Sequence, residues 1–169
     1  MGFINDRIIL GLVSGIIAAK PVELLNMVKQ RSGLTDISYA QVASKIFIPE
    51  EKMDTPLGNA ISALVNNVNA SASGIALTYL LTLTGRDKSI IKGISFGSVL
   101  WIVVNGLISS IGLDLKSKQP LTHVLSWLDH AIFGALCACL IRRLGSDNLF
   151  PDRDFREQRK IPLFYFPKN

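Results

Sequence analysis

The apolar residues of this chain are gathered into four long blocks, and most of the charged residues lie between those blocks. A helix that crosses a bilayer needs roughly 20 mainly apolar residues. Only helices and closed barrels can span lipid, and the blocks lack the strict alternation of barrel strands. The pattern therefore predicts an all-α integral membrane four-helix bundle, with spans at about 8–28, 57–83, 90–111 and 121–141.

The first block is the least regular of the four. It is cleanly apolar only over residues 8–19, which is too short a stretch to span a bilayer alone. The membrane span must therefore continue through Lys20, Pro21 and Glu23, or else stop short of them.

The segment after the first block predicts a short interfacial helix between the first two spans. Ser38 and Gln41 form a capping-box pattern, and apolar residues then follow at helical spacing until Pro49. Residues 1–145 would then form the transmembrane domain. Residues 146–169 would form a charged and aromatic tail, for which an interfacial anchor or, less readily, a partner contact is expected.

The charge of the chain fits a membrane topology better than nucleic-acid binding. The 169 residues carry a formal charge of +5, mostly in the second loop and the tail, and no basic module interleaved with aromatic residues is present. Lys and Arg concentrate on the cytoplasmic side of membrane proteins. The pair Arg142 and Arg143 after the last block therefore predicts a multi-pass protein with both termini in the cytoplasm.

Two charged residues inside the first block are candidates for function. Lys20 and Glu23 lie three residues apart, which makes them neighbours on a helix. A charge at the centre of a spanning helix costs roughly 2.5–3.5 kcal/mol on insertion scales, so a polar path for an ion or solute is one interpretation. The other is a span that ends early, with both side chains reaching the outer headgroups.

Three amides and one Asp–His pair extend this set to the other blocks. Asn66, Asn69 and Asn105 could hydrogen-bond between helices and set their register, or could line a polar seam for a small solute. Asp129 and His130 could relay protons or hold a cation, or could simply pair with nearby amides. No metal site or cofactor is predicted, because one helix supplies few converging ligands, and no catalytic motif is found.

Small residues suggest how the helices pack. Gly11 and Gly15 in the first block, and Gly93 and Gly97 in the third, place glycines one turn apart on one helical face. Such faces allow close approach of two helices in lipid. We interpret them as packing seams within the four-helix bundle, with homodimer contacts as the alternative.

Several short stretches resemble a known group of proteins. Asn5-Asp6-Arg7 leads into the first glycine-bearing helix, residues 92–97 read Lys-Gly-Ile-Ser-Phe-Gly before Leu100-Trp101, and Phe133-Gly134 lies in the last block. The chain resembles, over about residues 3–143, an uncharacterised group of small four-helix membrane proteins from clostridia-like bacteria and the similar YqhR-type proteins. The resemblance implies a bacterial plasma membrane and brings no known activity, catalytic residue or cofactor.

Three functional hypotheses remain from the sequence. The first is a non-enzymatic accessory or structural subunit that acts through helix contacts with itself or a larger complex. The second is a small transporter or channel for a solute, ion or proton, in which the polar residues face one cavity. A membrane enzyme ranks last, and nucleic acid is not an expected partner, whereas membrane lipid is.

Overall fold

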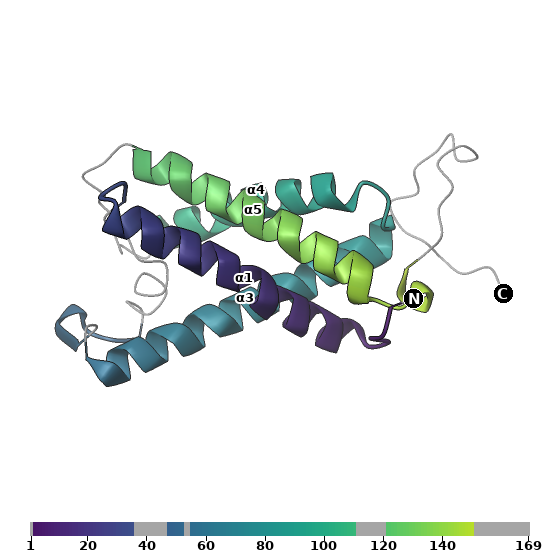
Figure 1. Cartoon of the computed structure of the whole chain (residues 1–169), viewed down its shortest axis with the longest axis horizontal. Coiled ribbons are helices and arrows are strands. Elements are labelled where there is room, and N and C mark those ends of the chain that lie inside the picture. Colours follow the sequence, from purple (N-terminus) through teal and green to yellow (C-terminus); the bar gives the residue numbers. More distant parts are fainter. Residues whose placement is uncertain (1, 36–46, 53–54, 111–120, 151–169) are drawn as a thin grey trace.

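The computed structural model describes residues 2–35, 47–52, 55–110 and 121–150, and Figure 1 shows their arrangement. No β-strand is present in these ranges, so the all-α prediction is confirmed for them. The predicted interfacial helix after Ser38 falls mainly on residues 36–46, outside the described part. The helices are α1 (Arg7–Arg31), α3 (Pro56–Thr84), α4 (Ser89–Ser110) and α5 (Leu121–Leu144), with short 3-10 turns η1 (Glu50–Lys52) and η2 (Asp147–Leu149).

Local sequence explains where the first two long helices begin. The Asp6 carboxylate accepts a hydrogen bond from the Ile9 amide at 2.8 Å, and the Thr55 hydroxyl accepts one from the Gly58 amide at 3.1 Å. Both are N-caps, which satisfy amides that have no partner within the helix. Helix α1 continues without a break through Pro21 to its end at Arg31. How far the membrane span follows this helix stays a prediction.

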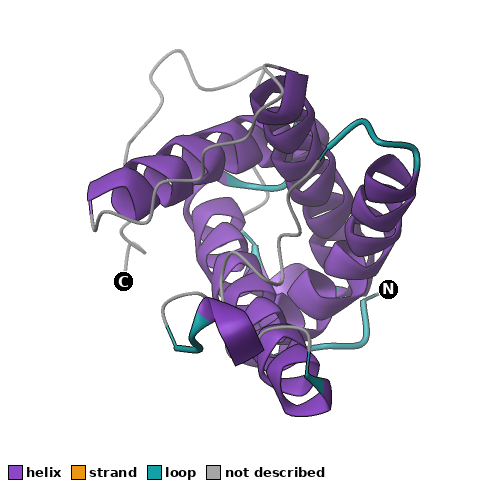
Figure 2. Cartoon of the chain, turned by 90° about the vertical axis from the view of Figure 1, so that its left-hand side faces the viewer, coloured by secondary structure: helices purple, strands orange, loops and turns teal. Residues whose placement is uncertain are grey.

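The four helices form two antiparallel pairs. Helix α1 packs against α3 and, less extensively, against α5, whereas α4 packs mainly against α5. Figure 1 shows α1 and α3 crossing and then separating toward the beginning of α3, and Figure 2 shows the same bundle from one end. The α1–α3 pair and the α4–α5 pair are therefore joined chiefly through the contact between α1 and α5.

Glycines lie at the crossing point of each pair. A Cβ atom added to Gly15 would lie 2.1 Å from the Ala70 carbonyl oxygen, and one added to Gly97 would lie 2.0 Å from the carbonyl oxygen of His130. Gly11 faces the backbone of Ile75, and Gly93 faces the backbone of Gly134, in the same way. Within one chain, all four glycines singled out from the sequence lie where two helix backbones touch.

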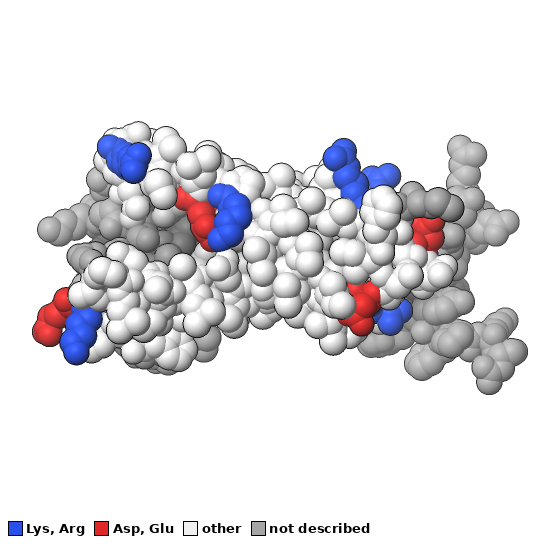
Figure 3. All heavy atoms as spheres, turned by 60° about the horizontal axis from the view of Figure 1, so that its bottom comes forward, with Lys and Arg blue, Asp and Glu red and all other residues white. Residues whose placement is uncertain are grey.

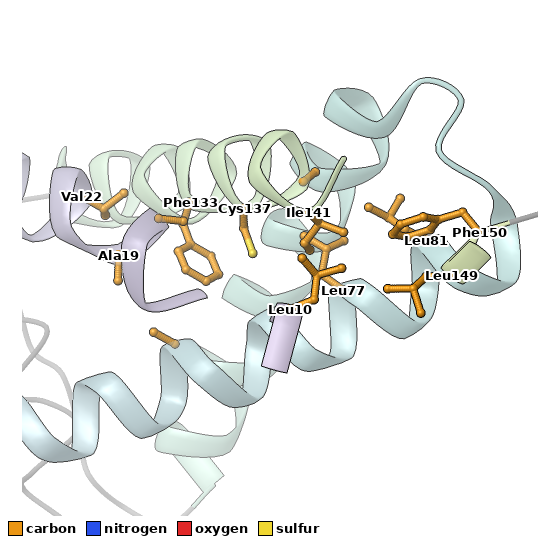
Figure 4. Packing of buried hydrophobic residues seen from close by; sticks show 13 residues of the cluster. Leu10, Ala19, Val22, Leu77, Leu81, Phe133, Cys137, Ile141, Leu149 and Phe150 are labelled. Carbon is orange, nitrogen blue, oxygen red and sulfur yellow. The ribbon is translucent and has the colours of Figure 1, made fainter. Parts of the chain in front are cut away.

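The buried apolar residues lie where α1, α3 and α5 meet (Figure 4). Leu10, Leu77 and Ile141 are fully buried there. Leu149 and Phe150 of the segment after α5 fold back and extend this core, which the expected tail beginning at residue 146 does not predict.

Backbone hydrogen bonds join the two ends of the helical region. The amides of Phe3 and Ile4 donate to the Leu144 carbonyl oxygen at 2.9 and 3.0 Å, and the Ser146 amide donates to the Ile4 carbonyl oxygen at 3.0 Å. The beginning of α1 and the end of α5 therefore lie at the same end of the bundle.

Three of the described helices are long and apolar enough to cross a membrane: α1, α4 as far as Gly106, and α5. This indicates a membrane protein, and Figure 3 shows an uncharged band between the charged ends of one face. Helix α3 is the longest at 29 residues but does not meet this criterion. Its first half is rich in amide and hydroxyl side chains, so the span expected at 57–83 stays a prediction.

Candidate functional site

A polar cluster bridges α1 and α3 beside their glycine crossing. The Lys20 ammonium donates to Glu23 Oε2 at 3.0 Å and to Asn67 Oδ1 at 2.9 Å. The Asn66 amide nitrogen donates to Glu23 Oε1 at 2.6 Å. We call these four residues the Lys20 cluster. They come together because a spacing of three residues places both charges on one side of α1, where they face two adjacent amides of α3.

The Lys20 cluster lies at the surface of the bundle. The side chains of Lys20 and Glu23 are 52% and 37% exposed. At 1.5 Å per residue, Lys20 lies about 20 Å along α1 from Arg7, well inside a helix that is apolar enough to span. The cluster is therefore a set of paired but uncovered charges on an apolar helix.

A second ion pair is buried between α1 and α5. The Lys29 ammonium contacts both carboxylate oxygens of Asp129, and the two side chains are only 14% and 2% exposed. Asn26, one turn before Lys29, and Thr122, two turns before Asp129, are also buried. A buried carboxylate needs such a partner because desolvation penalises an isolated charge. The ion pair of Lys29 and Asp129 therefore connects helices α1 and α3 to helices α4 and α5.

The end of the bundle that holds the N-terminus is basic. The Lys92 ammonium donates to the carbonyl oxygens of Thr84 and Gly85, both at 3.0 Å, and to Asp87 at 3.0 Å, so it caps the end of α3. Arg86 pairs with Asp147 at 2.7 Å and stacks over the Phe150 ring. We call this region the basic end, and it includes Arg7, Arg86, Lys88, Lys92, Arg142 and Arg143.

The other polar residues chosen from the sequence do not join these clusters through the contacts described. Asn105 donates to the Trp101 carbonyl oxygen at 2.8 Å, and His130 Nδ1 lies 2.8 Å from the Ser126 carbonyl oxygen, so both bond to their own helix. Asn69 lies exposed on α3. Of the seven candidates, the structure thus groups Lys20, Glu23 and Asn66, and places Asp129 in a separate pair.

Sequence reasoning missed Lys29 and Asn67 as participants. Lys29 was assigned to the loop because the first block was ended at Val28, whereas α1 runs one turn further. Its spacing of three residues from Asn26, itself three from Glu23, continues a polar series along the helix and could have revealed this.

Metal-binding and thiol chemistry gain no specific support from the described residues. No group of three or more His, Cys, Asp or Glu side chains among them could hold a metal ion. Cys137 is buried, Cys139 is partly buried, and both are free thiols on α5.

No protein-family model, curated protein or solved structure matches the chain.

Proposed function

We propose that this is a multi-pass membrane protein in which all four helices cross a bacterial plasma membrane. Helix α3 runs antiparallel to α1 over a long distance, since Gly11 faces Ile75 and Gly15 faces Ala70, while Lys20 bonds to Asn67. A helix packed in this register lies at the same depth in the membrane as α1, which supports a membrane span for α3. Close packing against a neighbour is also how polar residues are accommodated in lipid.

The orientation we propose places the basic end in the cytoplasm. The backbone bonds of Phe3 with Leu144, and the ion pair of Arg86 with Asp147, bring the N-terminus, the α3–α4 turn and the end of α5 together. Cytoplasmic segments carry an excess of Lys and Arg, and this end holds Arg142 and Arg143 as well. Both termini of the described region would then face the cytoplasm.

Within that membrane, the protein acts as a non-enzymatic accessory or structural subunit through lateral helix contacts. The observation that carries this proposal is the exposure of Lys20 and Glu23 well inside α1. Charges facing hydrocarbon cost several kcal/mol, and their bonds to Asn66 and Asn67 offset only part of this. A protein surface that covers the Lys20 cluster removes the remaining cost.

A transporter or channel for an ion, proton or small solute is the second candidate. Its specific support is the buried ion pair of Lys29 and Asp129, because ionisable groups between spanning helices often mark conduction paths. Buried Asn26 lies on α1 between Glu23 of the Lys20 cluster and Lys29 of this pair, so polar side chains follow one another at helical spacing from one site to the other. A membrane enzyme has the weakest support of the three, since no arrangement of catalytic side chains is described at the Lys20 cluster or at the ion pair of Lys29 and Asp129.

Site-specific photocrosslinking in native membranes tests the subunit proposal. A photoreactive residue replaces Leu24, which is 61% exposed beside Glu23, or Ile102 of α4, which is 62% exposed and serves as the control. We expect a light-dependent protein adduct of defined mass from position 24 and a much weaker one from position 102. Equal protein adducts at both positions, or lipid adducts alone, would contradict the proposal.

A further inference from the structure

The Lys20 cluster suggests which surface covers it. We propose that the α1–α3 face around Lys20 and Glu23 is a self-association surface, and that its partner in the membrane is a second copy of this chain. This inference rests on the proposed lateral-contact function and names the partner of that same face.

Charge complementarity favours a second copy. The cluster presents one ammonium and one carboxylate, both partly exposed, so it is neutral as a whole and complementary to itself. Two copies inserted in the same orientation are related by a two-fold axis perpendicular to the membrane. Equivalent atoms then lie at the same depth in both copies.

The geometry of the ion pair allows charges to alternate around that axis. Although Lys20 and Glu23 are three residues apart, their charged groups meet at 3.0 Å within one chain. The two ammonium groups and two carboxylates of a pair of copies can therefore meet at similar depth. Each Lys20 can contact the Glu23 of the other copy while keeping its own, so that every ammonium lies between two carboxylates.

Helix α3 supplies a surface on which another helix can lie closely. On the face of α3 that bears Asn66 and Asn67, the positions one and two turns earlier are small or amide-bearing and exposed: Asn59, Ala60 and Ala63. In the described residues, α3 packs mainly against α1, so this part of α3 has few helix neighbours. Small residues permit close backbone approach, and amides can hydrogen-bond across an interface in lipid.

Charge-exchange variants test whether copies meet through this face. Full-length chains with two different affinity tags are coexpressed, and the association of the two tags is measured in native membrane nanodiscs. Lys20→Glu in both copies, or Glu23→Lys in both copies, should reduce association at least about tenfold, because like charges would meet. Coexpression of one K20E copy with one E23K copy should restore association, because the opposite charges are again balanced across the interface.

Two controls separate the interface from folding. The double exchange K20E/E23K within one chain keeps the internal ion pair and should associate like the natural protein. Lys52→Glu changes an exposed charge in η1 and should leave association unchanged. Thermal unfolding of each variant in detergent shows whether the chain still folds, and restoration by the mixed pair cannot come from a general loss of folding.

The outcomes distinguish this inference from the proposed function. Restored association of the mixed pair supports the second copy as partner. Unchanged association in every variant overturns this face as the self-association surface. Absence of self-association, together with a position-24 adduct to a different protein, overturns the inference but leaves the subunit proposal intact. If neither self-association nor a protein adduct occurs, both proposals are wrong.

Discussion

In both helix pairs, α1–α3 and α4–α5, glycines allow the helices to pack closely, but the side chains next to the glycines differ. In both pairs glycines let the helix backbones touch, at Gly15 in one and at Gly97 in the other. Next to this crossing, α1–α3 carries the exposed Lys20 cluster, whereas in α4–α5 the Trp127 indole donates to the Ser98 hydroxyl at 3.1 Å. Backbone packing can therefore hold each pair together, while the first pair also exposes the charges of Lys20 and Glu23 beside its crossing.

The two pairs also depend on one another. Leu10 of α1 and Ile141 of α5 are fully buried in the shared core, and Lys29 of α1 contacts Asp129 of α5. The Lys29–Asp129 pair differs from the Lys20 cluster mainly in burial. A buried ion pair is costly to break and inexpensive to replace as a whole, whereas an exposed one is inexpensive to break in water.

The largest effect is expected when one partner of the buried pair is removed. Lys29→Met leaves the Asp129 carboxylate without its cation, and we expect a loss of about 3–5 kcal/mol in the free energy of unfolding. The double variant K29M/D129L replaces both charges with apolar groups and should recover most of this loss. Unfolding by SDS in mixed micelles, followed by circular dichroism, measures both values.

A different result would change the comparison between the two ion pairs. If K29M and the double variant lose the same stability, Lys29 contributes by packing and not by charge. Lys20→Met is the matched change in the exposed pair, and its effect on the isolated chain in detergent should be smaller, because Glu23 is less buried than Asp129 and keeps its bond from Asn66.

A smaller effect is expected at the glycine crossings. Gly15→Ala and Gly97→Ala each force a methyl group against a facing carbonyl oxygen, and overpacking of this kind costs roughly 1–3 kcal/mol. Gly106→Ala is the control, since no described atom beyond its own stretch of helix lies within 4 Å of the added carbon and alanine favours a helix. The same SDS titration should show losses for the first two variants and no loss for the third.

The two glycine variants should also differ from each other. Gly15→Ala separates α1 from α3 and should weaken the bonds of the Lys20 cluster, so a photoreactive residue at Leu24 should give an altered adduct pattern. Gly97→Ala separates α4 from α5 and should leave that pattern unchanged. Equal disturbance of the pattern by both variants would mean that the pairs do not behave as separate units.

The apolar blocks predicted the positions of the four described helices because a run of apolar residues is a local signal. The observed ends at Thr84 and Ser89 lie within one residue of the predicted limits 83 and 90. The glycine spacing also indicated helix contacts, because close approach requires the missing side chain itself. The end of α1 was placed too early, since Lys29 and Arg31 read as loop residues when only apolarity is considered.

The pairing of polar residues could not be read from the sequence in the same way. Asn66, Asn67 and Asn69 are nearly adjacent, and which of them meets Glu23 depends on the rotation of α3 against α1. That rotation is set by distant contacts such as Gly11 with Ile75. Asp129 is a candidate from the sequence, but its partner lies 100 residues earlier, in a segment that apolarity alone places in a loop.

The smallest expected effects concern single hydrogen bonds, and they compare the two helix pairs most directly. Trp127→Phe removes the indole donor to Ser98 and should cost about 0.6 kcal/mol, the average for a bond between helices in a membrane protein. Asn67→Leu removes the acceptor for the Lys20 ammonium and should cost about twice as much, because hydrogen bonds to charged groups are stronger. Asn69→Leu, at an exposed position two residues away, is the matched control and should have little effect on SDS unfolding. If Asn67→Leu costs no more than Asn69→Leu, the amide does not hold Lys20 in place, and the chemical difference between the pairs resides in Lys20 and Glu23 alone.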